Sequence, residues 1–498
     1  MMRFAIRCRT FHFFAAALAG AAGTAPLAAQ SPPPPSVQSP PPPSAPATLV
    51  LRNATRVEMW SYFEPQPGGG NPDYTNIANR LQLGVERRRP KYEMTATLQY
   101  VQFGGLPPDA TGPGPLGTGA LYFDQGGRTP ASRQFYLRYL NLKLNNLAPG
   151  WSLRLGRMGY ASGAESPSGD ESLEAIKRQR IDSRLLGEFE WSLYQRGFDG
   201  LRTDLDRSRW HASLALLRPT QGGFEDEAGS EIRDIDLWAA TASSKPGGLI
   251  PHTDWQVFAI GYDDERDVRQ RPDNSGLVPA RIDVNVTTMG TSMVAAYRRQ
   301  DGVRLDGVAW FAGQTGDWFG QTHRASAIDV EAGAQFMRTA WKPWIRGGYA
   351  RASGDADPRD LRHTTFFPVL PTARKYALSA TYSFMNLQDV FVQFLAAPRP
   401  TLSLRVDAHA LDLANPGDRW YFGSGAGQDT GASFGYGSRA SQGAVDFGTV
   451  VEGSADYRVS PHWSINGYLG TIRGGDVVRR TFRGSTLVFG YVENVVQF

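Results

Sequence analysis

Arginine dominates the basic residues of this 498-residue chain, in which only six of the 52 Lys and Arg residues are lysine. Four arginines lie on the polar side of segments where apolar and polar residues alternate: Arg154, Arg346, Arg405 and Arg458. A guanidinium group offers a planar pair of N–H donors that matches a carboxylate, whereas an ammonium group acts as a point charge. Arginines pointing into one enclosed space would therefore attract carboxylates. A GC-rich genome would raise the arginine count without any such role.

Acidic residues share the faces that carry these arginines. Asp407, Glu452 and Asp456 each lie an even number of residues from Arg405 or Arg458. In a conduit, interspersed acids keep a carboxylate solute from binding too tightly to leave. The alternative is that the opposite charges only neutralise a polar interior and brace its wall. Both interpretations stay open at the level of the sequence.

The elements that would position these side chains are β-strands of about ten residues. Leu402, Leu404 and Val406 alternate with Ser403, Arg405 and Asp407, and similar alternation occurs around residues 92–100, 210–216, 447–459 and 463–470. Ten residues suffice for a tilted strand to cross a bilayer, and strands of soluble sandwiches are usually shorter. The segment 135–144 shows no clear outward phase. We predict an all-β fold, a transmembrane antiparallel β-barrel of the bacterial outer-membrane type.

Composition excludes several other classes. Charged residues make up 20% of the chain, its mean hydropathy is −0.36, and no apolar run beyond the N-terminus approaches the length of a spanning helix. The 57 aromatic residues are too many for a disordered chain. We therefore expect neither a helical membrane protein nor a disordered one.

The N-terminus predicts export and three segments. Arg3, Arg7 and Arg9 precede a short apolar stretch and then small residues up to Ala29, which is typical of a secretory signal peptide over 1–29. Residues 30–47 form a Pro/Ser-rich spacer that cannot build a core. Residues 48–498 are then expected to form one barrel.

Removal of the signal peptide changes two counts. The loss of its three arginines leaves 49 basic against 48 acidic residues, so no basic surplus remains that would favour a nucleic-acid partner. Cys8, the single cysteine, is lost as well. The mature chain is thus expected to contain no disulfide, iron–sulfur cluster or cysteine-based zinc site.

Aromatic residues and loop lengths favour the same membrane. The segments end in aromatics at plausible interface depth, namely Trp60, Tyr62, Trp151, Trp344, Trp420, Tyr421 and Trp463. A complete aromatic girdle would favour a monomer surrounded by outer-membrane lipids and lipopolysaccharide. Long polar stretches at 104–130, 161–172, 220–234, 263–280, 352–373 and 423–443 contrast with short turns such as Asn145-Asn146 and Asp301-Gly302. The terminal Phe498 resembles the address read by the barrel assembly machinery.

Other groupings of reactive residues are less informative. The charged run from Asp170 to Glu188 is either an ordered constriction or a solvated loop. The acidic run Asp263–Asp267 could hold Ca²⁺ but lacks the glycine and spacing of a calcium loop. Ser403, Asp407 and His409 share a polar strand face. A membrane phospholipase would instead place its catalytic Ser–His pair on the lipid-facing side. We predict no catalysis, no cofactor and no metal.

Several segments resemble the alginate export family of outer-membrane barrels. They are Arg56–Glu58 followed by Asn79–Gly84, the strand Trp151–Arg157, the Phe-Asp-Gly-x-Arg strand Phe198–Arg202, and Gly348–Asp355 running into Thr364–Pro368. The resemblance spans roughly residues 52 to 498. Arg351, inserted into the Tyr-Ala-Ser-Gly-Asp pattern, and the Gly-rich loop at 104–130 depart from the family pattern.

The resemblance implies 18 strands and an arginine-lined conduit for polyuronate. By motif position it adds Arg157 and Arg202 to the arginines expected in the lumen, beside Asp407 and Glu452. We predict a passive outer-membrane channel for an anionic polysaccharide or other anionic solute, with periplasmic export components as further partners. The alternatives are a porin-like channel for uptake of small solutes and a structural barrel with a plugged lumen.

Overall fold

A computed structural model describes residues 47–111, 127–190, 192–222, 227–245, 250–267, 271–274, 284–372, 381–429 and 434–498. The expected signal peptide at 1–29, with Cys8, and nearly all of the expected spacer lie outside the described residues. The first strand begins at Thr48, the residue at which the barrel was expected to start.

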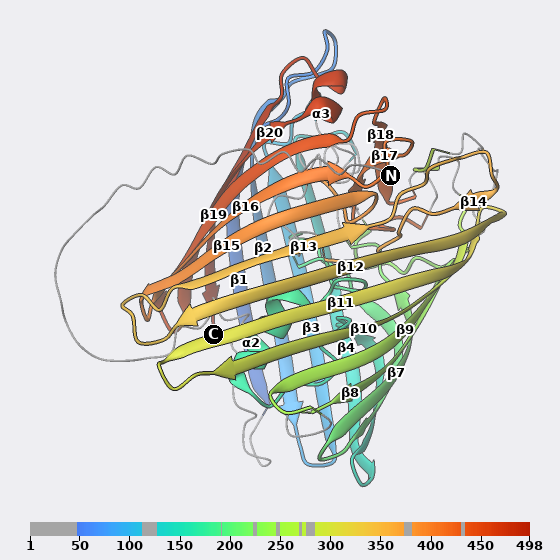
Figure 1. The fold of residues 1–498 in the computed structure, drawn as a ribbon. Coiled ribbons are helices and arrows are strands. Elements are labelled where there is room, and N and C mark those ends of the chain that lie inside the picture. Colours follow the sequence, from blue (N-terminus) through green and yellow to red (C-terminus); the bar gives the residue numbers. More distant parts are fainter. Residues whose placement is uncertain are drawn as a thin grey trace, which may run out of the picture.

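Eighteen antiparallel strands form a closed barrel, as predicted (Figure 1). The last strand pairs with the first, with Val57 opposite Val492, so the sheet has no free edge. The strands are β1 (Thr48–Ser61), β2 (Asp73–Arg88), β3 (Tyr92–Gly104), β4 (Ala131–Ala148), β5 (Trp151–Met158), β6 (Phe198–Asp206), β7 (Trp210–Pro219), β8 (Ile235–Ser244), β9 (Thr253–Asp264), β10 (Val284–Arg298), β11 (Val303–Trp318), β12 (Gln321–Phe336), β13 (Trp344–Ala352), β15 (Leu387–Arg399), β16 (Leu402–Leu413), β19 (Asp446–Ser460), β20 (Trp463–Gly474) and β21 (Thr486–Gln497).

The remaining elements belong to the connections. Helix α2 (Glu171–Arg180) lies between β5 and β6, and helix α3 (Asp476–Thr481) between β20 and β21. The two-residue strand β14 (Arg362–His363) pairs in parallel with β12, and β17 (Arg419–Gly423) forms a separate hairpin with β18 (Tyr436–Ala440). Among the described residues, neither helix is long or apolar enough to cross a membrane.

The predicted alternation is present along the strands. On β16, Val406 is 49% exposed on the outer face, whereas its neighbours Asp407 and His409 are buried on the inner face. On β3, Leu98 is exposed and Gln99 is fully buried. Since successive side chains of a strand point to opposite faces, one register decides both what meets the lipid and what lines the interior.

A β-bulge explains why residues 135–144 show no single outward phase. The pairing of β3 with β4 shifts between Thr97 and Leu98, which leaves Arg138 as the extra residue of β4. Phe135 is exposed before the bulge and Leu140 after it, so the outward positions change from odd to even numbers. Arg138 itself is buried inside the barrel.

Of the seven aromatic residues that were predicted to lie at the membrane interface, two are exposed on the outer face of the barrel. Trp151 and Trp463 are exposed on the outer face beside short turns. The other five residues of that prediction are buried: Trp60, Tyr62, Trp344, Trp420 and Tyr421. They pack on inner partners, as in the stack of Trp60 on Phe489 with centroids 3.9 Å apart. The argument for a monomer therefore loses its basis, and the monomeric state stays a prediction.

Connections at the two ends of the barrel differ in length, as expected for an outer-membrane barrel. Short turns at one end include Pro149-Gly150, Pro400-Thr401 and Pro461-His462, and the turn expected at Asn145-Asn146 is formed by Pro149-Gly150 instead. Long connections at the other end span 159–197, 353–386 and 414–445. We call these the turn end and the loop end. By the general rule, the turn end faces the periplasm.

Candidate functional site: the barrel interior

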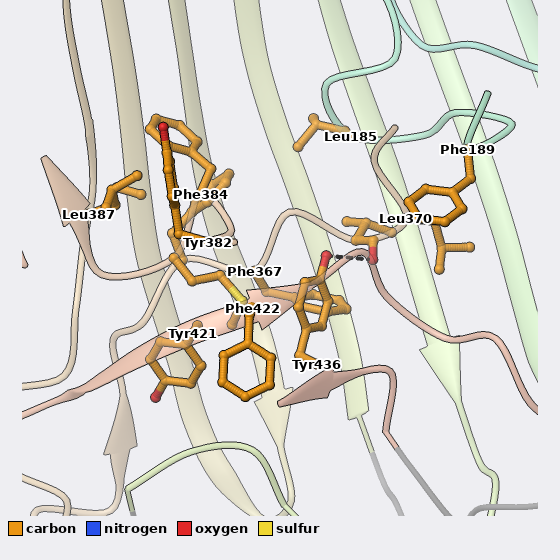
Figure 2. Packing of buried hydrophobic residues seen from close by; sticks show 14 of the residues in the cluster. Leu185, Phe189, Phe367, Leu370, Tyr382, Phe384, Leu387, Tyr421, Phe422 and Tyr436 are labelled. Atoms are coloured by element: carbon orange, nitrogen blue, oxygen red, sulfur yellow. Dashed lines mark hydrogen bonds between the residues drawn. The ribbon is translucent and has the colours of Figure 1, made fainter. Parts of the chain in front are cut away.

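Three long loops fold into the barrel from the loop end and pack on one another (Figure 2). Buried apolar side chains meet there from all three: Leu185 and Phe189 from 159–197, Phe367 and Leu370 from 353–386, and Tyr436 from β18. The Tyr436 hydroxyl donates to the Val369 carbonyl over 3.1 Å. We call the described parts of these loops the inner plug. Its core is apolar although it lies inside a membrane barrel, because the loops bury one another's hydrophobic side chains.

The charged run from Asp170 to Glu188 belongs to the inner plug. Asp170 caps α2 by accepting from the backbone N–H groups of Ser172 and Leu173. Glu171 and Glu174 lie in the first turn of α2 and basic residues in its last turn, which suits the helix dipole. The buried part of this run is ordered, so the interpretation as a solvated loop is wrong for it, and the constriction stays a prediction.

Buried ion pairs attach α2 and the residues after it to the barrel wall. Arg180 donates to Glu331 of β12 over 2.7 Å, and Arg184 pairs with Asp329 of the same strand. Lys177 donates to Asp254 of β9 over 3.1 Å. Although burial lowers the pKa of Arg180, the carboxylates of Glu331 and Asp329 outweigh it and raise that pKa above the usual value. These ion pairs join the plug to the wall. Removal of one partner of a buried pair is strongly destabilising, because the other charge stays buried without compensation.

Arg346 is part of the same buried network. It donates to Glu331 over 2.7 Å and pairs with Asp306 of β11, and all three side chains are without solvent exposure. The sequence predicted that Arg346 points inward, and it does. Its guanidinium is engaged by two carboxylates, so in this conformation it braces the wall and the plug.

Arg154, Arg202 and Arg405 also lie on the inner face, and their side chains keep 27%, 19% and 21% exposure. Arg154 donates to Asn141 over 2.6 Å, and Arg202 donates to Asp204 over 2.7 Å. Arg202 also reaches the Glu165 carbonyl at the edge of the plug. We call these three arginines, with their acidic neighbours and Arg458, the turn-end wall. It is the part of the predicted arginine set that water can reach.

Of the other residues predicted to line the lumen, Arg458 is exposed, whereas Asp407 and Glu452 are buried. Arg458 is exposed at the end of β19, where it donates to the Pro400 carbonyl over 3.3 Å in the adjacent turn. Asp407 and Glu452 are directly opposite each other on β16 and β19 and are almost fully buried. Asp407 accepts from Arg405, and Glu452 accepts from Tyr468 over 2.8 Å.

Arg157 lies on the outer face of the barrel, and the prediction that it lines the lumen is wrong. Its cross-strand neighbour Leu140 is 53% exposed to the outside, and directly opposite residues of a sheet share a face. Arg157 forms a bidentate ion pair with Asp199 of β6 at 2.8 and 2.5 Å. The next pair in this outer row joins Arg218 to Asp236. The motif position identified the end of the strand but could not decide which way the side chain points.

The sequence of this barrel matches the model of a family described as alginate export, over residues 128–486. The match covers well over half of the chain. The chain belongs to the alginate export family. Among curated protein sequences none matches it.

Solved outer-membrane proteins share the fold of this family member at low identity. OccAB2 of Acinetobacter baumannii is 7% identical, with a TM-score of 0.57 over 91% of this chain and 98% of that one. OccK9 (OpdG) of Pseudomonas aeruginosa is 12% identical, with a TM-score of 0.55 over 91% and 98%. OpdK of the same organism is 9% identical, with a TM-score of 0.53 over 91% and 99%. Family and fold together place this chain in the outer membrane as a channel-type barrel.

The segment that resembles the Tyr-Ala-Ser-Gly-Asp pattern of the family leads into the plug loop that follows β13. The Ser353 hydroxyl donates to the Thr364 carbonyl over 2.7 Å and accepts from the backbone of Ser326 over 3.0 Å. A Cβ on Gly354 would lie 1.9 Å from the Asn386 amide oxygen, so the close approach of these segments requires glycine. Burial, followed by the neighbouring Asp418, raises the pKa of Asp355 to about 6.

Sequence reasoning missed inner arginines on the first strands. Arg56 of β1 pairs with Glu58 over 3.2 Å and with Glu493 of β21 over 2.8 Å, across the seam that closes the barrel. Arg80 of β2 is buried nearby, and Arg138 of β4 pairs with Glu188 of the plug. The alternation in 73–88 could have identified Arg80. The bulge that turns Arg138 inward has no clear signal in the sequence.

The structure also places two groupings that the sequence singled out, the acidic run 263–267 and the strand face that contains His409. Asp264 is buried on the inner face and binds Arg266 through both carboxylate oxygens, whereas Asp263 has the opposite phase on β9. The acidic run 263–267 therefore does not gather around one point. The imidazole of His409 contacts Asp389 of β15 through Nδ1, at 3.0 and 2.9 Å.

Proposed function

We propose that this protein is a passive outer-membrane conduit for an anionic polysaccharide or other anionic solutes. The observation that carries the proposal is the turn-end wall, where Arg154, Arg202 and Arg405 point inward and stay partly exposed. Arginine remains charged throughout the physiological pH range, so the attraction does not depend on protonation. Carboxylates entering from the periplasmic side would meet this wall beside the plug, since Arg202 bonds the Glu165 carbonyl of the plug.

The acids of the turn-end wall limit the strength of the attraction. Asp204 is bonded to Arg202, and Asp407 to Arg405, so each arginine field is partly cancelled. The neighbouring acids lower the affinity of the wall for an anionic solute, but the wall still prefers anions to cations. A conduit needs such weak binding because the solute must be released. We therefore expect modest anion selectivity rather than tight binding.

The inner plug supports a conduit of restricted conductance. Since the plug packs apolar residues inside the barrel and α2 is paired with the turn-end parts of β9 and β12 through Lys177–Asp254 and Arg180–Glu331, transport of a polymer would need displacement of at least one plug segment. Elements of low local stability are the ones that move in gating. The buried network around Glu331 attaches the plug to the wall, and it would contribute to the energy of that displacement.

The proposed channel needs no chemical step, so we propose no catalysis and no cofactor. The environment of the barrel supplies its other partners: outer-membrane lipids and lipopolysaccharide around it, the barrel assembly machinery during insertion, and periplasmic export components at the turn end. A monomer suffices, because the closed barrel encloses the whole turn-end wall.

The second candidate is a porin-like channel for uptake of small solutes, with which the shared barrel fold is compatible. Planar-bilayer recording of the purified barrel separates the two. An exporter of anionic polymers should be blocked by oligouronate added at the turn end and much less by uncharged oligosaccharide of equal length. Indifference to oligouronate together with steady conductance of small ions of either sign would favour the porin.

A further inference from the structure

The wall formed by β15, β16 and β19 contains a buried group of residues of which the channel proposal uses only Asp407, as the partner of Arg405. Asp407, His409 and Glu452 each offer one potential ligand atom, and these atoms lie within 4.8 Å of one another. Asp407 and His409 are two residues apart on one face of β16, and Glu452 is directly opposite Asp407 on β19. Strand pairing, rather than any spacing in the sequence, brings the three together.

Two polar atoms of this group lack a hydrogen-bond partner among the described residues. They are Nε2 of His409 and Oδ1 of Asp407, both on side chains that are at least 98% buried. An unpartnered buried polar atom costs roughly 1–3 kcal/mol, so such atoms call for a physical reason. A cation between these two atoms would satisfy both at once.

The orientation of His409 is the one a metal ligand requires. Its Nδ1 lies 2.9 and 3.0 Å from the two oxygens of Asp389. A carboxylate can only accept, so Nδ1 of the neutral ring carries the hydrogen and Nε2 keeps its lone pair. Phe391 stacks on the ring with centroids 5.5 Å apart and holds its plane. Metal-binding histidines are usually oriented by a carboxylate in this way.

The charges around the site also favour a cation. Asp389, Asp407 and Glu452 supply three carboxylates, and Arg405 is the arginine that bonds one of them, through the other oxygen of Asp407. The nearby Arg180 is held by Glu331. A second oxygen of the group, Oε2 of Glu452, is positioned by the Tyr468 hydroxyl over 2.8 Å.

We propose that His409, Asp407 and Glu452 bind a divalent transition metal ion on the inner wall of the barrel, with Asp389 as the positioning residue. One imidazole and two carboxylate oxygens match the ligand chemistry of Zn²⁺, which would keep a fourth position for water. The site is independent of the direction of transport and of the solute.

Isothermal titration of the purified, untagged and EDTA-treated barrel with Zn²⁺ tests this site. The expected result is one ion per chain, with binding abolished by His409→Gln and by Glu452→Gln. Asp389→Asn should weaken binding about 10- to 100-fold, as loss of an orienting carboxylate does elsewhere. His211→Gln is the matched control, since His211 is also a buried inward histidine bonded to an aspartate, Asp204. It should bind Zn²⁺ as the wild type does.

Two results would overturn the proposal: failure of the wild-type barrel to bind Zn²⁺, or unchanged binding by His409→Gln. Should a variant fail to fold, zinc-edge X-ray absorption of the wild-type barrel decides instead. One imidazole nitrogen with oxygen neighbours around the metal would support the site. A shell of oxygen atoms alone would contradict it.

Discussion

Arg180 of helix α2 and Glu331 of strand β12 form an ion pair of 2.7 Å in the interior of the barrel, and both side chains are buried. The two residues belong to a loop from one side of the barrel and a wall strand from another. Glu331 also accepts from Arg346 of β13, so one carboxylate binds both an arginine of the plug and an arginine of the neighbouring wall strand. The plug is thus attached by charge as well as by apolar packing.

Replacement of Glu331 should open the plug. Glu331→Ala leaves Arg180 and Arg346 without their shared carboxylate, and breaking a buried pair costs about 3–5 kcal/mol. We expect larger single-channel conductance, and faster entry of a bulky antibiotic into cells that express the variant.

The control for this prediction is Asp236→Ala. Asp236 pairs with Arg218 on the outer face, where both side chains are largely exposed. Exposed pairs contribute about 0–1 kcal/mol, so conductance should not change. Equal conductance of both variants and the wild type would show that the network does not hold the plug.

The phase of β16 can be tested by placing a charge on each face. Val406→Arg puts a guanidinium into hydrocarbon, which costs about 2–4 kcal/mol near the bilayer midplane. Ser403→Arg puts the same group on the inner face and should fold normally. The measurement is the fraction of heat-modifiable barrel after refolding into vesicles, together with the urea midpoint. Equal yields for the two variants would mean that the assigned phase of this strand is wrong.

Much of the barrel could be predicted from sequence because lipid imposes one simple rule on every strand. The outward positions of β3, β7, β16 and β20 follow from period-two alternation, as Leu98 and Val406 illustrate. The rule fails at the bulge of β4, where an extra residue, Arg138, changes the phase. It also fails for Arg157, since the outer face near the loop end tolerates ion pairs and polarity no longer distinguishes the two faces.

The inner plug could not be predicted from local patterns. Trp420 and Tyr421 were expected at the membrane interface because they are aromatic, yet both are buried, and Trp420 packs on Phe63 and Phe482 from other connections. Where a long loop goes depends on partners distant in sequence, as with Arg180 and Glu331. Period and composition contain no information about such partners, so the charged run at 170–188 left two interpretations open.

Docking of the plug loop after β13 should weaken as the pH rises from about 4 to 7. Burial, followed by Asp418, raises the pKa of Asp355 from 3.8 to about 6. A carboxyl whose pKa is higher in the folded state stabilises it fully below its unfolded pKa, and this contribution is lost as the pH rises through 6. Hydrogen exchange of residues 353–366, corrected for intrinsic rates, should show more protection at pH 5 than at pH 7.5.

Asp355→Asn removes the titrating group from that loop. The variant should keep the same protection at both pH values. If the wild type is equally protected at pH 5 and 7.5, the buried pair of Asp355 and Asp418 does not control the docking of this loop.

The reversal potential in a salt gradient tests the conduit proposal most directly. In asymmetric KCl across a planar bilayer, the wild-type barrel should show a reversal potential on the anion-selective side. The triple variant Arg154→Gln, Arg405→Gln and Arg458→Gln should shift it towards cations, because it removes three inward charges that water can reach. The control replaces three exposed arginines outside the turn-end wall by glutamine, namely Arg218, Arg299 and Arg324, and should keep the wild-type value. A wild-type barrel that is already cation-selective, or a triple variant with an unchanged reversal potential, would contradict the account.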